Sequence, residues 1–144
     1  MEAKFRKIKS DIDFNQNIKK IINDAVFLAA QINVKEIKSG LDTSKGPKGS
    51  IPKVKASTAR QKRKKGQPIK PLIATGMMRR LPPVKGKSGK STISLANKRV
   101  KIAQYHEQGA GNLPKREFFD IYPSAVRKAE RMFKKLLVKL LKKL

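Results

Sequence analysis

The chain has 144 residues, enough for one domain with a modest core, and 38% of them are hydrophobic. Its 36 lysines and arginines against 10 acidic residues give a formal charge of +26, which a polyanion, an acidic protein surface or an anionic membrane would offset. Nucleic acid is the default partner of such a chain. The absence of cysteine excludes disulfides, thiolate metal sites and a cysteine nucleophile.

Hydropathy along the chain predicts a protein that does not enter a membrane. No stretch approaches the roughly 18 apolar residues that a transmembrane helix needs. The first residues, MEAKFRKIKSDIDF, lack the apolar centre of a signal peptide. We therefore expect a soluble protein made in the cytoplasm.

Residues 11–35 are predicted to form an amphipathic helix. Asp11, Asp13 and Asn15 are candidates to cap its start, where the helix dipole favours an acceptor. Apolar residues recur at spacings of three and four, which is typical of a helix packed on a core. They are Ile18, Ile21, Ile22, Ala25, Val26, Ala29 and Ile32.

Residues 38–71 are predicted to be a long basic loop or arm. They include eleven lysines and arginines, one acid (Asp42), four glycines and four prolines, which break any long periodicity. Ser57 or Thr58 is placed to cap a short helix over ARQKRKK. Loops of this length are usually functional or disordered, and we expect disorder over residues 40–66 in the free protein.

Two interpretations of the arm remain open. The sequence RQKRKK is typical of a nucleic-acid-binding patch, whereas a solvated loop that orders only against a partner explains the same residues. Stacking on RNA bases is not expected, because no aromatic residue occurs from position 28 to 104. Contacts between lysines and phosphates remain open.

Residues 72–106 are predicted to contain strands. LIATG ends in a glycine turn, and RRLPPV and STISLA flank the glycine-rich turn KGKSGK, as in a β-hairpin. Ile93 and Leu95 alternate with polar neighbours, and Val100, Ile102 and Tyr105 continue the pattern. GKSGKST is not interpreted as a nucleotide-binding loop, because the required first glycine is missing and the residues after it favour a strand over a helix.

The stretch YHEQGAGNLPKREFF, residues 105–119, is predicted to be a structural corner. We expect His106 to end a strand and Gly109 to let the backbone turn. One of the two phenylalanines at 118–119 is expected to anchor the next segment in the core. Arg116 is the residue expected to meet a carboxylate or phosphate of a partner.

His106 is the only histidine, and it does not predict a catalytic site. A metal site needs three or four converging ligands, and a general base needs an orienting acid and a nucleophile within reach. Glu107 stands beside His106, but the ten acids form no evident carboxylate pair. We interpret His106 as a structural or interface residue, and we predict no enzymatic activity, metal or cofactor.

Residues 123–144 are predicted to form a second helix, with Pro123 in its first turn. An apolar face runs from Val126 to Leu144, and lysines and arginines cover the rest. Alone, this pattern is typical of a basic helix that lies on a membrane or on a binding protein. In a chain with so few other apolar residues, a core helix is the preferred interpretation.

The order of these segments resembles the virion morphogenesis or tail-completion proteins of tailed phages, especially the Mu-like group. STAR (57–60) is similar to the threonine-led short helix of that family, and PLIATGMMR (71–79) to its second motif. YHEQG (105–109) with PKREF (114–118) is similar to its third and most specific motif. The resemblance covers residues 55–122 and the two flanking helices.

The resemblance implies a structural protein of the phage neck that joins the tail to the connector without catalysis. Its partners would be a connector or adaptor protein, a tail terminator or tail-tube protein, and further copies in a hexameric or dodecameric ring. Packaged DNA is a second candidate counter-charge for the arm. The protein would assemble in the host cytoplasm and remain in the virion, with no membrane contact.

The site residues that follow from the arm and from the motifs are contacts to partners rather than catalytic groups. They are Thr58, Arg60, Lys62, Arg63, Lys64, Lys65, Thr75, Gly76, His106, Gln108, Gly109, Pro114, Arg116 and Phe118.

The sequence thus predicts one domain of α+β class over residues 1–144. The helices at 11–35 and 123–144 would pack on a small, mainly antiparallel sheet within residues 72–122, and the arm would project. A ribosomal-type or DNA-coating protein is the alternative function, because the charge alone explains it. A membrane-active protein acting through the C-terminal helix is a weaker third hypothesis.

Overall fold

The computed structural model describes residues 10–87, 89–95 and 97–142, and it begins with a helix longer than predicted. This helix, α1, spans Ser10–Thr43, whereas the prediction ended at residue 35. The helical spacing of apolar residues continues through Ile37 and Leu41, and both are buried. Because α1 begins at Ser10, the candidate caps Asp11, Asp13 and Asn15 all lie inside the helix rather than before it, and that prediction is wrong.

Gly40 is required in this last part of α1 because other segments pass very close to it. A Cβ at Gly40 would come within 2.3 Å of the Lys45 carbonyl oxygen and 2.4 Å of the Tyr122 hydroxyl oxygen. The helix tolerates the weak propensity of glycine here, since the chain must return directly over this turn.

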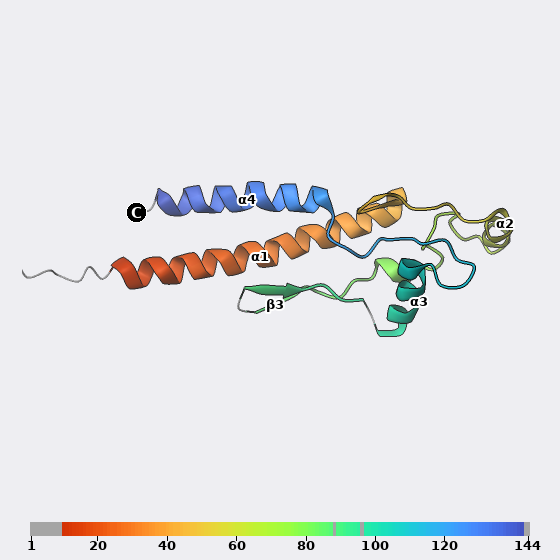
Figure 1. Cartoon of the computed structure of the whole chain (residues 1–144), viewed down its shortest axis with the longest axis horizontal. Coiled ribbons are helices and arrows are strands. Elements are labelled where there is room, and N and C mark those ends of the chain that lie inside the picture. Colours follow the sequence, from red (N-terminus) through yellow and green to blue (C-terminus); the bar gives the residue numbers. More distant parts are fainter. Residues whose placement is uncertain (1–9, 88, 96, 143–144) are drawn as a thin grey trace, which may run out of the picture.

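The C-terminal helix α4 spans Pro123–Leu141 and runs antiparallel to α1 along much of its length (Figure 1). Pro123 lies in its first turn, as predicted. The α+β class is confirmed, and the N- and C-terminal helices pack on each other.

The sheet consists of two separate antiparallel hairpins. β1 (Lys45–Gly46) pairs with β2 (Gly49–Ser50), and β3 (Lys85–Lys87) pairs with β4 (Lys90–Thr92). The predicted hairpin around KGKSGK is confirmed, but its strands begin within the glycine-rich segment, because the two prolines before it have no N–H to donate. In Figure 1 this hairpin lies along α1 on the side away from α4.

Two predicted strands are wrong. LIATG contains no strand and leads into a short 3-10 helix, η1 (Met77–Arg79). The segment after β4 is a helix, α3 (Asn97–Gln108). The alternation that predicted a strand there was misleading, because Ile102 and Tyr105 are exposed and Ala103 is the buried residue of this helix.

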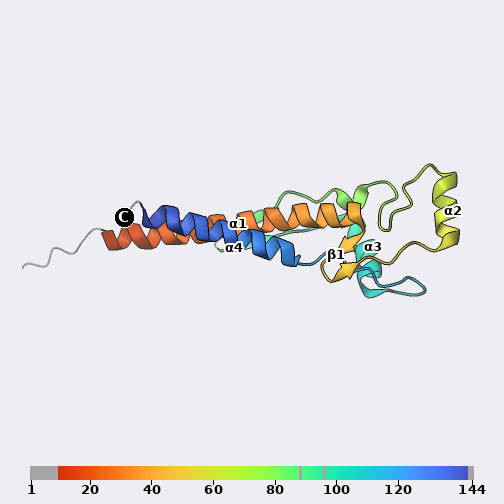
Figure 2. The same cartoon turned by 90° about the horizontal axis from the view of Figure 1, so that it is seen from above.

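The arm is partly ordered by the core. Leu41 and Ile51 are buried, so the prediction of disorder over residues 40–66 is wrong for its first part. The predicted short helix is confirmed as α2 (Ala56–Lys64), which projects at one extreme of the molecule (Figure 2). Its N-cap is Lys55 with no side-chain cap, so the expected cap by Ser57 or Thr58 is wrong.

The molecule is elongated, with a head and a helix pair (Figures 1 and 2). The head contains β1–β2, α2, η1 and α3, and the first part of α1 and the last part of α4 extend away from it. The buried apolar residues gather in the head and at the adjoining ends of the pair. They are Ile37, Leu41, Ile51, Ile73, Met78, Ala103, Phe118, Tyr122 and Ala125.

The outer part of the helix pair buries its apolar residues only partly. Residues predicted as the core stripe of α1, from Ile18 to Ile32, are half-buried except for Ile22, which is exposed. On α4, Val138 is 51% exposed and Leu141 is 63% exposed. Among residues 10–87, 89–95 and 97–142, no further helix or strand covers the free ends of these two helices.

Candidate functional site

The corner, defined here as residues 105–122, is held first by contacts within itself. His106 lies in the last turn of α3, not at the end of a strand as predicted. Gly109 has a φ of 69° and turns the chain out of the helix, as expected. The chain then returns, so that the Arg116 N–H donates to the His106 carbonyl oxygen at 2.7 Å.

Arg116 fastens the arm to the corner. Arg116 is 5% exposed. Its Nε donates to the Pro52 carbonyl oxygen at 3.1 Å, and its Nη2 donates to the Lys53 carbonyl oxygen at 3.2 Å. Burial lowers the pKa of the guanidinium, which nevertheless stays protonated as arginines in proteins do. Arg116 thus makes contacts inside the chain, and its expected contact with a partner stays a prediction.

Glu107 caps the returning segment, a role that the sequence did not predict. One carboxylate oxygen accepts hydrogen bonds from the N–H groups of Phe118 and Phe119, each at 2.7 Å. Phe118 is fully buried, which confirms that one of the two phenylalanines anchors the core. Had residues 97–108 been recognised as a helix, Glu107 would have been placed on the side of α3 that faces this segment.

Asn33 and Tyr122 complete the corner and were also missed. Asn33 is buried in α1; its amide nitrogen donates to the Asp120 carbonyl at 3.1 Å, and its oxygen accepts from the Tyr122 N–H at 2.9 Å. The Tyr122 hydroxyl oxygen lies 3.2 Å from the carbonyl oxygens of both Lys45 and Phe118, and its single proton is donated to one of them at a time. Burial, followed by the charges of two glutamates, raises the pKa of Tyr122 to about 12.

The nearest charged group described for His106 is a guanidinium rather than a carboxylate. Its Nδ1 lies 3.4 Å from a terminal nitrogen of Arg116, and no carboxylate orients it in the described hydrogen-bond network. Burial, and secondly the positive charge of Arg116, lower the pKa of His106 below its ordinary 6.5. The imidazole is therefore neutral at pH 7 and serves as an acceptor next to the guanidinium.

Beside the corner lies a cleft of about 430 Å³ that brings four separate segments together. We call it the basic cleft. Six of the predicted site residues line it: Thr58, Lys62, Thr75, His106, Pro114 and Arg116. The other lining residues are Val54, Lys55, Leu72, Ile73, Ala74, Met77, Met78, Arg99, Ile102, Asn112 and Leu113.

The charged groups that line the basic cleft, Lys55, Lys62, Arg99 and Arg116, are all cationic. Lys62 reaches back from α2, and its Nζ donates to the carbonyls of Lys70 and Ile73, each at 2.6 Å. Burial, and secondly the charge of Arg116, lower the pKa of Lys62. Arg99 contributes a buried Nε that has no hydrogen-bond partner.

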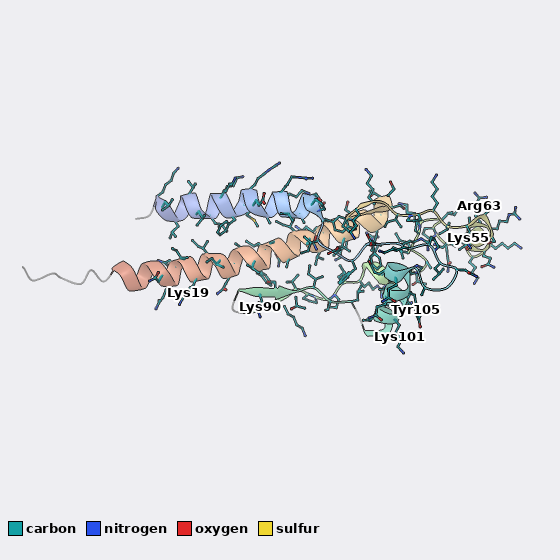
Figure 3. All side chains as sticks on the ribbon, viewed as in Figure 1. Lys19, Lys55, Arg63, Lys90, Lys101 and Tyr105 are labelled. Atoms are coloured by element: carbon teal, nitrogen blue, oxygen red, sulfur yellow. The ribbon has the colours of Figure 1, made fainter. Side chains whose placement is uncertain are left out.

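The remaining predicted residues lie outside the cleft. Arg60, Arg63 and Lys64 on α2 and Lys65 directly after it are exposed, and Figure 3 shows Arg63 at this end of the molecule. Gln108 is exposed at the end of α3. Gly76 adopts a φ of 72° before η1, and Phe118 and Gly109 serve the corner as described.

The described residues contain neither a cluster of metal ligands nor a helix that could span a membrane. Within residues 10–87, 89–95 and 97–142, no three histidine or acidic side chains come together as a metal site. No helix in that part of the chain is both long enough and apolar enough to cross a bilayer.

Comparison with models of known protein families finds no match, and neither do comparisons with curated proteins and with solved structures.

Proposed function

We propose that this chain is a structural tail-completion protein of a tailed phage, which joins the tail to the connector by assembling into a ring. One observation carries the proposal: the motif pieces that suggested the resemblance lie far apart in sequence but line the same cleft. Thr58 comes from the first piece, Thr75 from the second, and His106 and Pro114 from the third. Residues that share a site in space are more informative than motifs scattered over a fold.

The shape of the molecule also supports a role in assembly. α4 leaves apolar side chains exposed: Val126 lies near its start, and Val138 and Leu141 lie in its outer part. Ile121, at the entrance to α4, is 66% exposed. Large apolar side chains exposed along one elongated feature are typical of a surface that a partner covers.

The proposal includes no catalytic step. The two side chains of the corner that could act as an acid or a base already have partners inside the chain. Glu107 accepts hydrogen bonds from two backbone N–H groups, and His106 lies against Arg116. The partners in the proposal are a connector or adaptor, a tail terminator or tail-tube protein, and other copies of the chain. The protein would assemble in the host cytoplasm and remain in the neck of the virion.

Electron microscopy and sedimentation of the purified chain test this proposal. We expect closed rings, alone or after addition of a connector or tail-tube protein from the same genome. A chain that stays monomeric with every such protein, and yet binds duplex DNA tightly, would contradict it.

The alternative is a nucleic-acid-binding protein, and α2 is the feature that favours it. Arg60, Arg63 and Lys64 are exposed on this short helix at the tip of the molecule, and Lys65 is exposed directly after it. No acidic residue occurs from position 43 to 106. If this alternative holds, affinity for nonspecific duplex DNA falls steeply with salt, and neutralising these four residues reduces the salt dependence. If the first proposal holds, DNA binding is weak beside binding to the protein partner.

A further inference from the structure

The basic cleft concentrates positive charge that its own lining does not neutralise. Lys55, Lys62, Arg99 and Arg116 line it, and none of the lining residues is acidic. Burial, and secondly the charge of Arg116, lower the pKa of Lys62, so its positive charge is held in the cleft at a cost. An anion in the cleft would reduce that cost.

The four cations of the cleft differ in whether their hydrogen-bond donors are already used inside the chain. Lys62 and Arg116 already donate to backbone carbonyls, so they contribute charge more than free donors. Arg99 has an unsatisfied Nε, and Lys55 is exposed beside α2 (Figure 3). A carboxylate entering the cleft would meet the exposed Lys55 first, whereas the Nε of Arg99 is buried in the lining and has no hydrogen-bond partner among the described residues.

The remainder of the lining is mainly apolar. Ile102 and Leu113 are large apolar residues that stay exposed, and Leu72 and Met77 are partly exposed beside them. The sugar-phosphate backbone of a nucleic acid is polar and would not cover such an apolar surface. Base stacking is not supplied either, because Tyr105, the exposed aromatic residue of α3, is not among the lining residues (Figure 3). A peptide that carries both carboxylates and an apolar side chain uses both parts of the lining.

We propose that the basic cleft binds an extended acidic segment of a partner protein, with one apolar side chain of that segment against Ile102 and Leu113. The inference rests on the proposed function, because it identifies what the assembly subunit grips. It also gives the motif residues a common role, since Thr58, Thr75 and Pro114 shape the site while the cations attract the segment.

Fluorescence anisotropy with the full chain tests the site. The probe is a short fluorescein-labelled peptide in which pairs of glutamates separate single leucines. Combined Lys55→Glu and Arg99→Glu should weaken its binding at least about tenfold, because both positions become repulsive. Ile102→Ser should weaken binding about threefold or more, since only the apolar contact is lost.

Arg63→Glu with Lys64→Glu is the matched control, because it makes the same change in net charge on the surface of α2 outside the cleft. We expect less than a threefold effect from it, and weaker binding of a peptide with serine in place of leucine. Equal losses from the two charge reversals would overturn the proposal, as would displacement of the peptide by an equal concentration of duplex oligonucleotide. Absence of binding by the unmodified chain would overturn it too.

The two proposals can fail separately in the same samples. Sedimentation without peptide reports on ring assembly, and anisotropy reports on the cleft. Rings without peptide binding contradict the acidic-segment site and leave the assembly function standing. Peptide binding without rings, alone or with neck proteins, contradicts the assembly function and leaves the cleft a peptide site. Circular dichroism of Ile102→Ser, a change at an exposed residue, confirms that the loss of binding does not come from unfolding.

Discussion

The head and the outer helix pair are built on opposite principles. In the head, polar groups are matched one by one: Glu107 caps two N–H groups, Asn33 bridges the chain before α4, and Arg116 holds the arm. In the outer pair, two amphipathic helices touch along one side and leave apolar residues exposed. The head therefore defines its own shape, while the pair depends on what covers it.

This contrast explains how so basic a chain folds. The acidic side chains that form ion pairs lie in the head or where the head meets the helix pair. Glu36 pairs with Lys128, Asp42 pairs with Arg79, and Glu117 pairs with two lysines. The few acids are used where segments distant in sequence meet, and the excess positive charge stays on the surface. Partners of opposite charge would then bind without competing with the fold.

Phe118→Ala should have the largest effect on stability. Phe118 is fully buried at the centre of the head, so removing its ring leaves a cavity and should cost about 3–5 kcal/mol. Urea denaturation measures the change. Ile121→Ala is the control at an exposed position, where about 0.5 kcal/mol or less is expected. Similar losses at both positions would show that the head is not the centre of stability.

Glu107→Ala should have the next largest effect. It leaves the N–H groups of Phe118 and Phe119 without their acceptor, at a cost of about 1–3 kcal/mol in the free energy of unfolding. Gln108→Ala, at the exposed neighbouring position, is the matched control in the same denaturation series. If the two substitutions destabilise equally, the carboxylate does not cap the corner.

The outer pair should tolerate a polar substitution in the isolated chain. Val138→Ser changes a residue that is 51% exposed, so the free energy of unfolding should move by about 0.5 kcal/mol or less. If another copy or a neck protein covers α4, the same substitution should weaken assembly, measured by sedimentation. A large loss of stability in the monomer would mean that α4 is already packed as firmly as the head.

The smallest predicted effect is a pH dependence that belongs to one residue. The folded chain lowers the pKa of His106 from 6.5, mainly through burial, so the unfolded chain binds the proton more readily. Stability should therefore fall as pH drops through 6.5 and level off below the folded pKa. His106 is the only histidine, so His106→Gln should make the denaturation midpoint nearly independent of pH between about pH 7.5 and 5.5. An unchanged slope in the variant would assign the effect elsewhere.

Strong helical periodicity and strong turn residues were predictable from the sequence. The stripe from Ile18 to Ile32 and the proline at position 123 located α1 and α4, and the glycines of KGKSGK located the β3–β4 hairpin. The turn at Gly109 and the buried Phe118 followed from residue type alone. These features depend on local chemistry, which one sequence contains.

Features that depend on distant partners were missed. The alternation of Val100 and Ile102 suggested a strand, because short apolar patterns do not separate a strand from a helix. The buried position of Arg116 depends on carbonyls 63 and 64 residues away, and that of Asn33 on groups 87 and 89 residues away. The cleft itself depends on four segments meeting, so its motif residues were predicted individually but not as one site.

Native-state hydrogen exchange on the chain, dilute and under assembly conditions, tests the central claim most directly. We predict slow exchange around residues 103–122 in both states, and slow exchange in the outer halves of α1 and α4 only after assembly. Protection that is equally high in the outer pair of the dilute monomer, and unchanged at any concentration or with neck proteins, would contradict the account.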